Sequence, residues 1–342
     1  MRAWPNYQLQ NTKYSGAAGT PSNGGLRVRC SWFSLRAMKP RYPRLFIGVA
    51  VAFAALNAFA APLRVLYFTK SSGFEHSAIQ QSNGGQSYSE KVLTALAAKH
   101  DMTVTVSKDG SLFTPTYLAQ FDVLLFYTSG DLTSTGTDRY PGITGNGLAA
   151  LFDYVAGGGG LVGLHSTSDT FHTNERGGGN NPRRAQRFRN YGEAADPFAK
   201  MLGGEFIRHG AQQVAVATVT DPGFPGFSGI GSELKVQEEW YTLKEFAADN
   251  HVLLVMQTGG MTGPDYQRPP FPLAWVRQHG KGRVGYNAMG HRDDVWDSAA
   301  YQSMLVGMLQ WAGGKVTADV TPNLAQVTPG AMTLQALPPD TK

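Results

Sequence analysis

Four short runs of apolar residues, none broken by a charged residue, most strongly limit how this chain can fold. They span residues 65–68, 123–127, 161–164 and 252–256. A strand with only one buried face alternates apolar and polar residues, so an unbroken run indicates burial on both faces. Such strands are typical of a parallel sheet covered by helices on both sides. The runs therefore predict an α/β fold.

Amphipathic segments separate these runs. One helix is predicted where apolar residues recur with helical spacing from Leu148 to Val155, and it should end at the glycine run 157–160. A second apolar helix face covers residues 92–97, and a third helix is expected from an N-cap at Asp297 to Gly313. This alternation predicts a doubly wound, mostly parallel sheet, in which ligands bind beyond the carboxyl ends of the strands.

Residues 38–60 have the pattern of a bacterial export signal. The basic residues Lys39, Arg41 and Arg44 come first, an apolar core follows at residues 45–56, and residues 58–60 read Ala-Phe-Ala. This order predicts a signal peptide that is cleaved to leave Ala61 or Pro62 at the new N-terminus. The apolar core is too short for a spanning helix, so we expect a periplasmic or secreted protein with no stable membrane anchor.

The predicted removal of the signal peptide changes how the net charge and the domain organisation of the chain are interpreted. Of 30 basic and 25 acidic residues, the first 60 residues hold eight basic and no acidic ones, so residues 61–342 carry a net charge of −3. That balance does not favour nucleic-acid binding. Residues 1–37 precede a second Met and are expected to be an extension outside the fold. We expect one α/β domain at residues 61–316 and a polar, proline-bearing tail at residues 317–342.

Histidines cluster at predicted strand exits and in glycine-flanked turns. The candidates for catalysis are His76, His165, His209 and His291, together with Glu239. Because parallel strands end at the same edge of a sheet, these side chains are expected to meet. Imidazoles with a pKa near neutral suit both proton transfer and metal ligation.

The spacing leaves both roles open. The four histidines are candidate ligands for a divalent metal, although no HExxH motif is present. His165 occupies the place of a nucleophile elbow, and a serine hydrolase that used Ser166 or Ser168 would need a different register. The glycine run 157–160 precedes a strand, which is opposite to a phosphate-binding loop, so no nucleotide cofactor is expected. The single cysteine, Cys30, lies before the predicted cleavage site, which excludes a cysteine nucleophile from residues 61–342.

A series of motifs occurs in a fixed order between Leu63 and Gly314. They are Gly-Phe-x-His at 73–76, Gly-Leu-His-Ser at 163–166, Gly-Gly-x-Phe at 203–206, Glu-Glu-x-Tyr at 238–241, Pro-Leu-Ala-Trp at 272–275, Gly-Lys-Gly-Arg-Val at 280–284 and Gly-His at 290–291. In this order they resemble the ThuA-like, or trehalose-utilisation, family. The resemblance implies a flavodoxin-like fold of the class I glutamine amidotransferase type. The glutaminase relatives use a cysteine at the elbow, where this chain has His165, so amidotransferase activity is not expected.

The resemblance also implies carbohydrate metabolism. We expect a small-molecule carbohydrate substrate, either a disaccharide or a 3-keto-glycoside, and acid–base chemistry by the histidines and Glu239, with or without a metal. Tyr241, Asp169 and Trp275 are the expected substrate-binding residues. The alternative is a non-catalytic periplasmic sugar-binding or accessory protein that uses the same edge of the sheet.

Overall fold

The computed structural model describes residues 61–82, 84–173 and 187–336. These residues belong to one unit of the chain, Phe59–Lys342. The predicted signal peptide and residues 1–37 lie outside the described residues. Within the described part, no helix is long and apolar enough to cross a membrane.

A nine-stranded sheet forms the centre of this unit, in the order β2-β1-β3-β4-β11-β10-β9-β6-β7. Its strands are β1 (Leu63–Phe68), β2 (Met102–Ser107), β3 (Val123–Phe126), β4 (Gly160–Leu164), β6 (Gln213–Val219), β7 (Glu233–Glu238), β9 (His251–Gln257), β10 (Phe271–His279) and β11 (Gly282–Asn287). Parallel pairing joins the first five strands of this order. Antiparallel pairing joins the rest.

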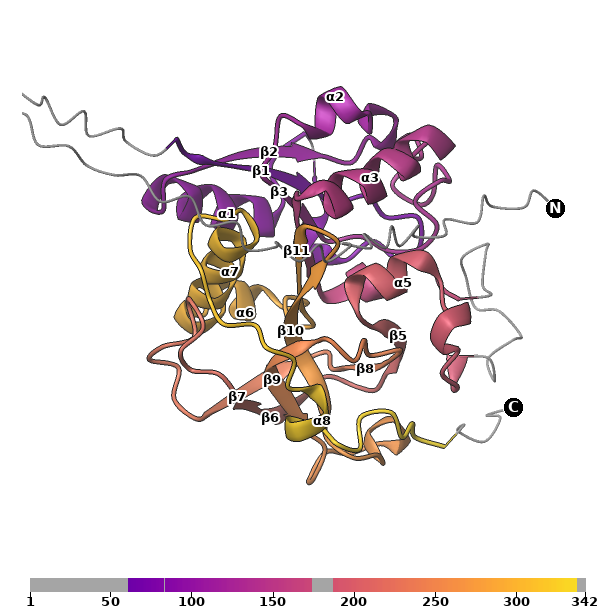
Figure 1. Cartoon of the computed structure of the whole chain (residues 1–342), viewed down its shortest axis with the longest axis vertical. Coiled ribbons are helices and arrows are strands. Elements are labelled where there is room, and N and C mark those ends of the chain that lie inside the picture. The colour runs from indigo at the N-terminus through magenta and orange to yellow at the C-terminus, as the bar shows by residue number, and fades with distance from the viewer. Residues whose placement is uncertain (1–60, 83, 174–186, 337–342) are drawn as a thin grey trace, which may run out of the picture. The chain divides into compact units, whose positions relative to one another are not determined.

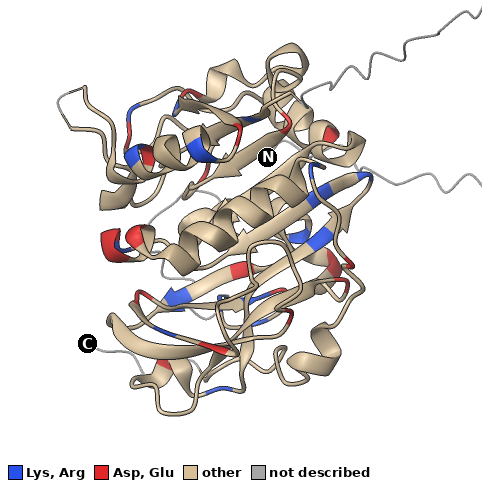
Figure 2. Ribbon diagram, turned by 90° about the vertical axis from the view of Figure 1, so that its left-hand side faces the viewer, with Lys and Arg blue, Asp and Glu red and all other residues tan. Residues whose placement is uncertain are grey.

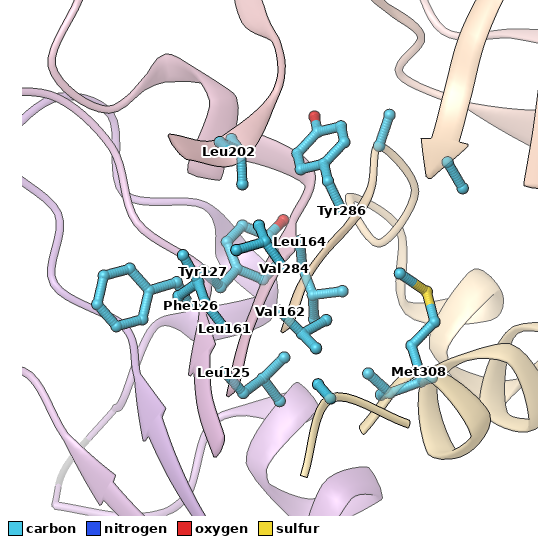
Figure 3. Close-up of a cluster of buried hydrophobic side chains, with 14 of the residues drawn as sticks. Leu125, Phe126, Tyr127, Leu161, Val162, Leu164, Leu202, Val284, Tyr286 and Met308 are labelled. Carbon is cyan, nitrogen blue, oxygen red and sulfur yellow. The ribbon is translucent and has the colours of Figure 1, made fainter. Parts of the chain in front are cut away.

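Helices cover both faces of the sheet, and the predicted α/β fold is confirmed. The helices are α1 (Tyr88–Lys99), α2 (Pro115–Leu118), α3 (Gly145–Gly157), α5 (Pro197–Leu202), α6 (Asp293–Asp297), α7 (Ala299–Ala312) and α8 (Leu324–Val327). In Figure 1, α1, α6 and α7 lie on one side of the strands, and α3 and α5 lie on the other. Figure 3 shows how side chains of β3, β4 and β11 fill the space between Leu202 of α5 and Met308 of α7.

The sheet is more mixed than the apolar runs suggested. β9 contains the run at residues 252–256, yet it pairs antiparallel with both β10 and β6. All but the last of its residues are buried. An unbroken apolar run reports burial on both faces, whichever direction the neighbouring strands take.

Local sequence signals explain most of the helix ends. Ser87 and Glu90 form a capping box at the start of α1. α3 ends at the glycine run as predicted, and Gly158 has a φ of 127°, which an L-residue rarely adopts. The prediction for α7 was wrong at its start: Asp297 ends α6, and Ser298 precedes α7 without a side-chain cap. The hydroxyl group of Tyr88 instead donates a hydrogen bond to the Asp297 carboxylate, at 2.6 Å.

A separate two-stranded sheet lies beside the main one. β5 (Glu205–His209) pairs antiparallel with β8 (Tyr241–Lys244), and His209 is opposite Tyr241. This pairing places two of the candidate residues next to each other. Glu239 lies in the short connection between β7 and β8.

Residues 317–336 pack against the domain. Asn323 accepts a hydrogen bond from the Val252 amide at 2.6 Å, and the buried guanidinium group of Arg268 donates to the Ala331 carbonyl at 2.7 Å. The first 20 residues of the expected tail are therefore part of the folded unit.

Candidate functional site

Three parallel strands of the sheet, β1, β4 and β11, bring three histidines to one edge. His165 follows β4 directly, His291 follows β11 after three intervening residues, and His76 lies in the longer loop after β1. The three rings lie close together, with centroids 4.8 to 5.3 Å apart. We call these three histidines and Glu239 the His–Glu cluster, because ligating atoms from all four lie within 4.8 Å of one another.

His165 is held in one orientation at the strand-to-helix turn. Its φ of 40° lies in the left-handed region, which costs a non-glycine residue conformational energy. The side chain is completely buried, and Nδ1 lies 2.9 Å from the carbonyl oxygen of Ala288. A carbonyl oxygen only accepts hydrogen bonds, so Nδ1 carries the proton. In the neutral ring, the lone pair of Nε2 therefore faces the cluster.

Glu239 connects all the candidate histidines through its two carboxylate oxygens. Oε2 lies 3.1 Å from Nδ1 of His291, 3.4 Å from Nε2 of His165 and 3.9 Å from Nε2 of His76. Oε1 faces outward and lies 3.3 Å from Nδ1 of His209. His209 is the exposed member of the group, and His291 and Glu239 are the partly exposed members of the cluster itself, with 17% and 12% of their side chains reaching solvent.

The neighbouring carboxylate, Glu238, fixes the backbone that carries His291. It is fully buried, and its Oε2 accepts hydrogen bonds from the amides of Gly290 and His291 at 2.9 and 3.1 Å. Gly290 has a φ of 117°, and a Cβ at this position would lie 2.6 Å from the hydroxyl oxygen of Tyr301. Only glycine fits this turn without displacing the chain that holds His291.

Two buried tyrosines pack against the cluster. The ring of Tyr241 lies 4.1 Å from that of His165, and its hydroxyl group lies 3.3 Å from Nε2 of His76. Tyr127, which directly follows β3, donates a hydrogen bond to the Gly290 carbonyl at 3.0 Å. Burial and the nearby carboxylates Asp169 and Glu239 raise the pKa of Tyr241 well above its usual value, so it stays a hydrogen-bond donor at neutral pH.

Burial and mutual contacts determine the charges in the cluster. Burial raises the pKa of Glu239, but the contacts of its carboxylate with the rings of His165 and His291 outweigh that effect and hold the pKa far below its usual range. Burial lowers the pKa of His76 well below 6.5, and the charges of His165 and His291 add to this effect. Burial also opposes protonation of His291, yet the hydrogen bond and charge of Glu239 raise its pKa overall. The cluster therefore combines an ionised carboxylate with two imidazoles whose pKa values are shifted in opposite directions.

A family comparison agrees with this architecture. The model of the family named ThuA, described as trehalose utilisation, matches residues 64–312. The chain belongs to the ThuA family. The resemblance inferred from the ordered motifs is thus confirmed, and it links the protein to carbohydrate utilisation.

Solved structures of ThuA-like proteins have the same fold. One from Bacteroides uniformis ATCC 8492 is 18% identical, with 76% of this chain and 95% of that chain covered, at a TM-score of 0.52. Another, from Parabacteroides merdae ATCC 43184, is 17% identical, with 81% and 98% covered, at a TM-score of 0.51. At this identity the likeness establishes the fold alone. No protein of curated function matches the sequence.

The three expected substrate-binding residues of this ThuA family member lie in different surroundings. Tyr241 packs directly on the cluster. Asp169 is half-buried and pairs with His172. The assignment of Trp275 was wrong, because this side chain is completely buried in β10 and its indole nitrogen donates to the Leu202 carbonyl at 2.8 Å. An indole enclosed in this way has no surface to offer a sugar.

A second buried polar network lies beside the cluster, and the sequence did not reveal it. His172 pairs with Asp169 on one ring nitrogen, and its Nδ1 lies 3.4 Å from Glu205 of β5. Lys244 of β8 lies 3.1 Å from the same Glu205 oxygen. These contacts join the chain after β4 to the small sheet that carries His209 and Tyr241.

Other residues that shape the cluster were also missed. Tyr127 is the last residue of an apolar run, so the strand-exit rule that selected His165 applies to it as well. Phe74 lies in the first motif and is 68% exposed, with its ring 4.9 Å from that of His76. An exposed aromatic side chain next to buried histidines is a signal that only the structure provides.

Proposed function

We propose that the protein is an enzyme of carbohydrate metabolism that acts on disaccharides or 3-keto-glycosides at the His–Glu cluster. The observation that carries this proposal is the convergence of His76, His165, His291 and Glu239 at the carboxyl edge of the parallel strands. Ligands bind at this edge in doubly wound folds. Membership of a family described as trehalose utilisation supports a sugar as the substrate.

The proposed reaction is an elimination. A ketone at C3 of a sugar acidifies the hydrogen on C2, so a positioned base can remove that proton. The electron pair then forms a C1=C2 double bond, the bond from C1 to its substituent oxygen breaks, and the departing alkoxide takes a proton from an acid. The reaction needs a base, an acid and a group that polarises the ketone.

The side chains around the cluster suit these tasks. His209 is exposed and is paired with Glu239 at 3.3 Å, so it can exchange a proton with a bound sugar. A ring N–H of His291 and the hydroxyl group of Tyr241 are donors that can polarise a carbonyl group or protonate a leaving oxygen. Phe74 offers an exposed aromatic face against which the apolar side of a pyranose ring can pack.

A substrate screen with a matched variant pair tests the enzymatic proposal. Purified protein is incubated with disaccharides and with 3-keto-glycosides, and the released alcohol or reducing sugar is measured. We expect turnover that falls by about 100-fold or more in Glu239→Gln and is unchanged in Glu233→Gln, which alters an exposed carboxylate on β7. Saturable sugar binding without turnover would favour the non-catalytic binding protein instead. Equal turnover in both variants would contradict the site assignment.

We also propose that residues 38–60 direct export to the periplasm or the medium. The basic segment, apolar core and Ala-Phe-Ala sequence support this proposal. N-terminal sequencing of protein from the envelope fraction of the native host should begin at Ala61 or Pro62. A cytoplasmic product that retains Met1 or Met38 would contradict it. We further propose that nucleic acids are not partners, since basic and acidic residues are interspersed in Figure 2.

A further inference from the structure

We propose that the His–Glu cluster binds one divalent transition-metal ion, with zinc as the best-fitting ion, through His76, His165, His291 and Glu239. This inference rests on the proposed function in placing the chemistry at this cluster. Its main test measures metal content and does not depend on any reaction.

The spacing of the ligating atoms fits a tetrahedral site. Bonds of about 2.0–2.1 Å from zinc to nitrogen or oxygen give neighbouring ligand atoms about 3.3–3.4 Å apart at the corners of a tetrahedron. Three of the four ligating atoms already lie at nearly these distances from one another. Oε2 of Glu239 lies 3.1 Å from Nδ1 of His291 and 3.4 Å from Nε2 of His165, and those two nitrogens are 3.3 Å apart. His76 can complete the set, because all four ligating atoms lie within 4.8 Å of one another.

The orientation of His165 is that of a metal ligand. Its Nδ1–H is committed to the carbonyl oxygen of Ala288 at 2.9 Å, so the lone pair of Nε2 faces the cluster. Ligating histidines commonly donate their other ring N–H to a carbonyl or carboxylate group, which fixes both tautomer and ring direction. The hydrogen bonds that the Gly290 and His291 amides donate to the Glu238 carboxylate hold the backbone that carries His291.

The ring nitrogens of His76 are poorly satisfied by hydrogen bonds. The residue is 3% exposed, and its Nδ1 has no hydrogen-bond partner among the described residues. Its Nε2 has only a 3.3 Å contact with the Tyr241 hydroxyl group and a 3.9 Å approach to Glu239. A buried imidazole so poorly satisfied is costly. Coordination of a cation at Nε2 would give that nitrogen a strong partner, and Nδ1 would be the remaining group to satisfy.

The crowding of the rings also favours a metal. Three imidazoles with centroids 4.8 to 5.3 Å apart repel one another when they are protonated in a buried site. A divalent ion binds all three in the neutral form and compensates the charge of Glu239. Three nitrogens and one oxygen suit zinc, cobalt or nickel, whereas magnesium and calcium prefer oxygen ligands.

His209 lies outside the proposed ligand set. It contacts the outward oxygen of Glu239 at 3.3 Å and is exposed. It is therefore free to transfer protons beside a bound ion. When bound, the ion would supply Lewis-acid polarisation of a sugar carbonyl, or a water of lowered pKa, by accepting that oxygen as a fifth ligand beside the four side chains.

Equilibrium dialysis tests the site directly. Protein stripped with a chelator and checked for folding by circular dichroism is dialysed against zinc, cobalt or magnesium salts, and bound metal is measured by mass spectrometry. We expect one zinc or cobalt ion per chain, no magnesium, and a visible cobalt spectrum typical of nitrogen and oxygen ligands in a site of low coordination number. Folded wild-type protein that takes up no zinc or cobalt would overturn the proposal.

Variants assign the site to these residues. His165→Ala and Glu239→Gln should weaken zinc binding by at least about 10- to 100-fold, while His100→Ala, which alters an exposed histidine after α1, should bind as the wild type does. If His165→Ala does not fold, His291→Gln provides the same comparison. Unweakened binding in folded variants of the cluster would refute the assignment. Zinc binding without turnover of any sugar would leave the metal site standing and remove the proposed reaction, whereas sugar turnover by folded protein that takes up no zinc or cobalt would do the reverse.

Discussion

At the scale of single residues, His165 combines backbone strain, complete burial and a fixed tautomer. A φ of 40° is unfavourable for histidine, and the hydrogen bond to the Ala288 carbonyl helps to hold it there. Strain of this kind, when other contacts maintain it, is common at functional sites. The sequence predicted His165 at the elbow position, and the structure buries its side chain there against the ring of Tyr241. Its replacement should therefore affect both activity and stability.

We expect His165→Ala to lower sugar turnover by about 100-fold or more. We also expect it to lower the free energy of unfolding by about 1–3 kcal/mol, because the Ala288 carbonyl loses its partner in a buried site. Turnover per folded molecule and chemical denaturation measure the two effects separately. His100→Ala, on the exposed end of α1, is the matched control and should change neither quantity. A variant with full activity per folded molecule would show that His165 is purely structural.

At the scale of elements, the turn after β11 determines where His291 lies. Gly290→Ala would place a Cβ 2.6 Å from the Tyr301 hydroxyl oxygen at a φ of 117°. We expect a loss of about 1–3 kcal/mol in stability from strain and weaker metal or sugar binding, since His291 must move. Thermal unfolding and binding measurements test this. Gly259→Ala, at an exposed glycine with no atom within 4 Å of its Cβ, should behave as the wild type. Unchanged binding in Gly290→Ala would mean that the turn does not position His291.

The pairing of His172 with Glu205 links the small sheet to the chain after β4 and predicts a pH dependence. Burial opposes the charge on His172, but the charge and hydrogen bond of Asp169 raise its pKa to about 9. Burial likewise opposes ionisation of Glu205, yet His172 and Lys244 lower its pKa to about 2. Because folding raises the pKa of His172, its charged form stabilises the folded protein. This stabilisation is fully present below about pH 6.5 and is lost as the pH rises through 9. Because folding lowers the pKa of Glu205, its ionised form also stabilises the folded protein. This stabilisation is fully present above about pH 4.5 and is lost as the pH falls toward 2.

The stability contributed by this pair should therefore be greatest between about pH 4.5 and 6.5. Urea unfolding of the wild type and of His172→Gln across pH 5 to 10 measures the alkaline side. We expect the difference in unfolding free energy between the two proteins to shrink as the pH rises through 9. His100→Ala should follow the wild-type profile throughout. A difference that stays constant with pH would show that His172 is not charged in the folded protein.

How far the sequence predicts these elements depends on the range of the interaction involved. The positions of the strand exits could be predicted, because an apolar run marks each strand and parallel strands end at the same edge of a sheet. These exits bring His76, His165 and His291 together. The enclosure of Trp275 could not be predicted, since it depends on α5 and its Leu202 carbonyl, far away in the sequence. Glu238 likewise acts on backbone amides 52 and 53 residues away. The antiparallel pairing of β9 has no signature in a fully buried strand.

At the scale of the whole molecule, the segment after α7 packs against β8, the strand that carries Tyr241 of the candidate site. Arg268 is buried, and one of its nitrogens donates to the Leu243 carbonyl of β8 at 2.7 Å while the other donates to Ala331. Gln335 donates to the Thr242 hydroxyl group of the same strand, at 2.9 Å. The C-terminal segment thus supports β8, the strand that carries Tyr241 against His165.

A chain that ends at Val316 should consequently lose both stability and site geometry. Removal of the buried Leu324 alone costs about 1.5–3 kcal/mol, and the Val252 amide and Arg268 lose their partners as well. We expect a lower urea midpoint and weaker sugar or metal binding at a temperature where the truncated chain remains folded. Gln326→Ala, an exposed change within the same segment, should stay within about 0.5 kcal/mol of the wild type. If the truncated chain were less stable yet bound its ligands with unchanged affinity, β8 would hold Tyr241 without help from the C-terminal segment, and the segment would serve stability alone.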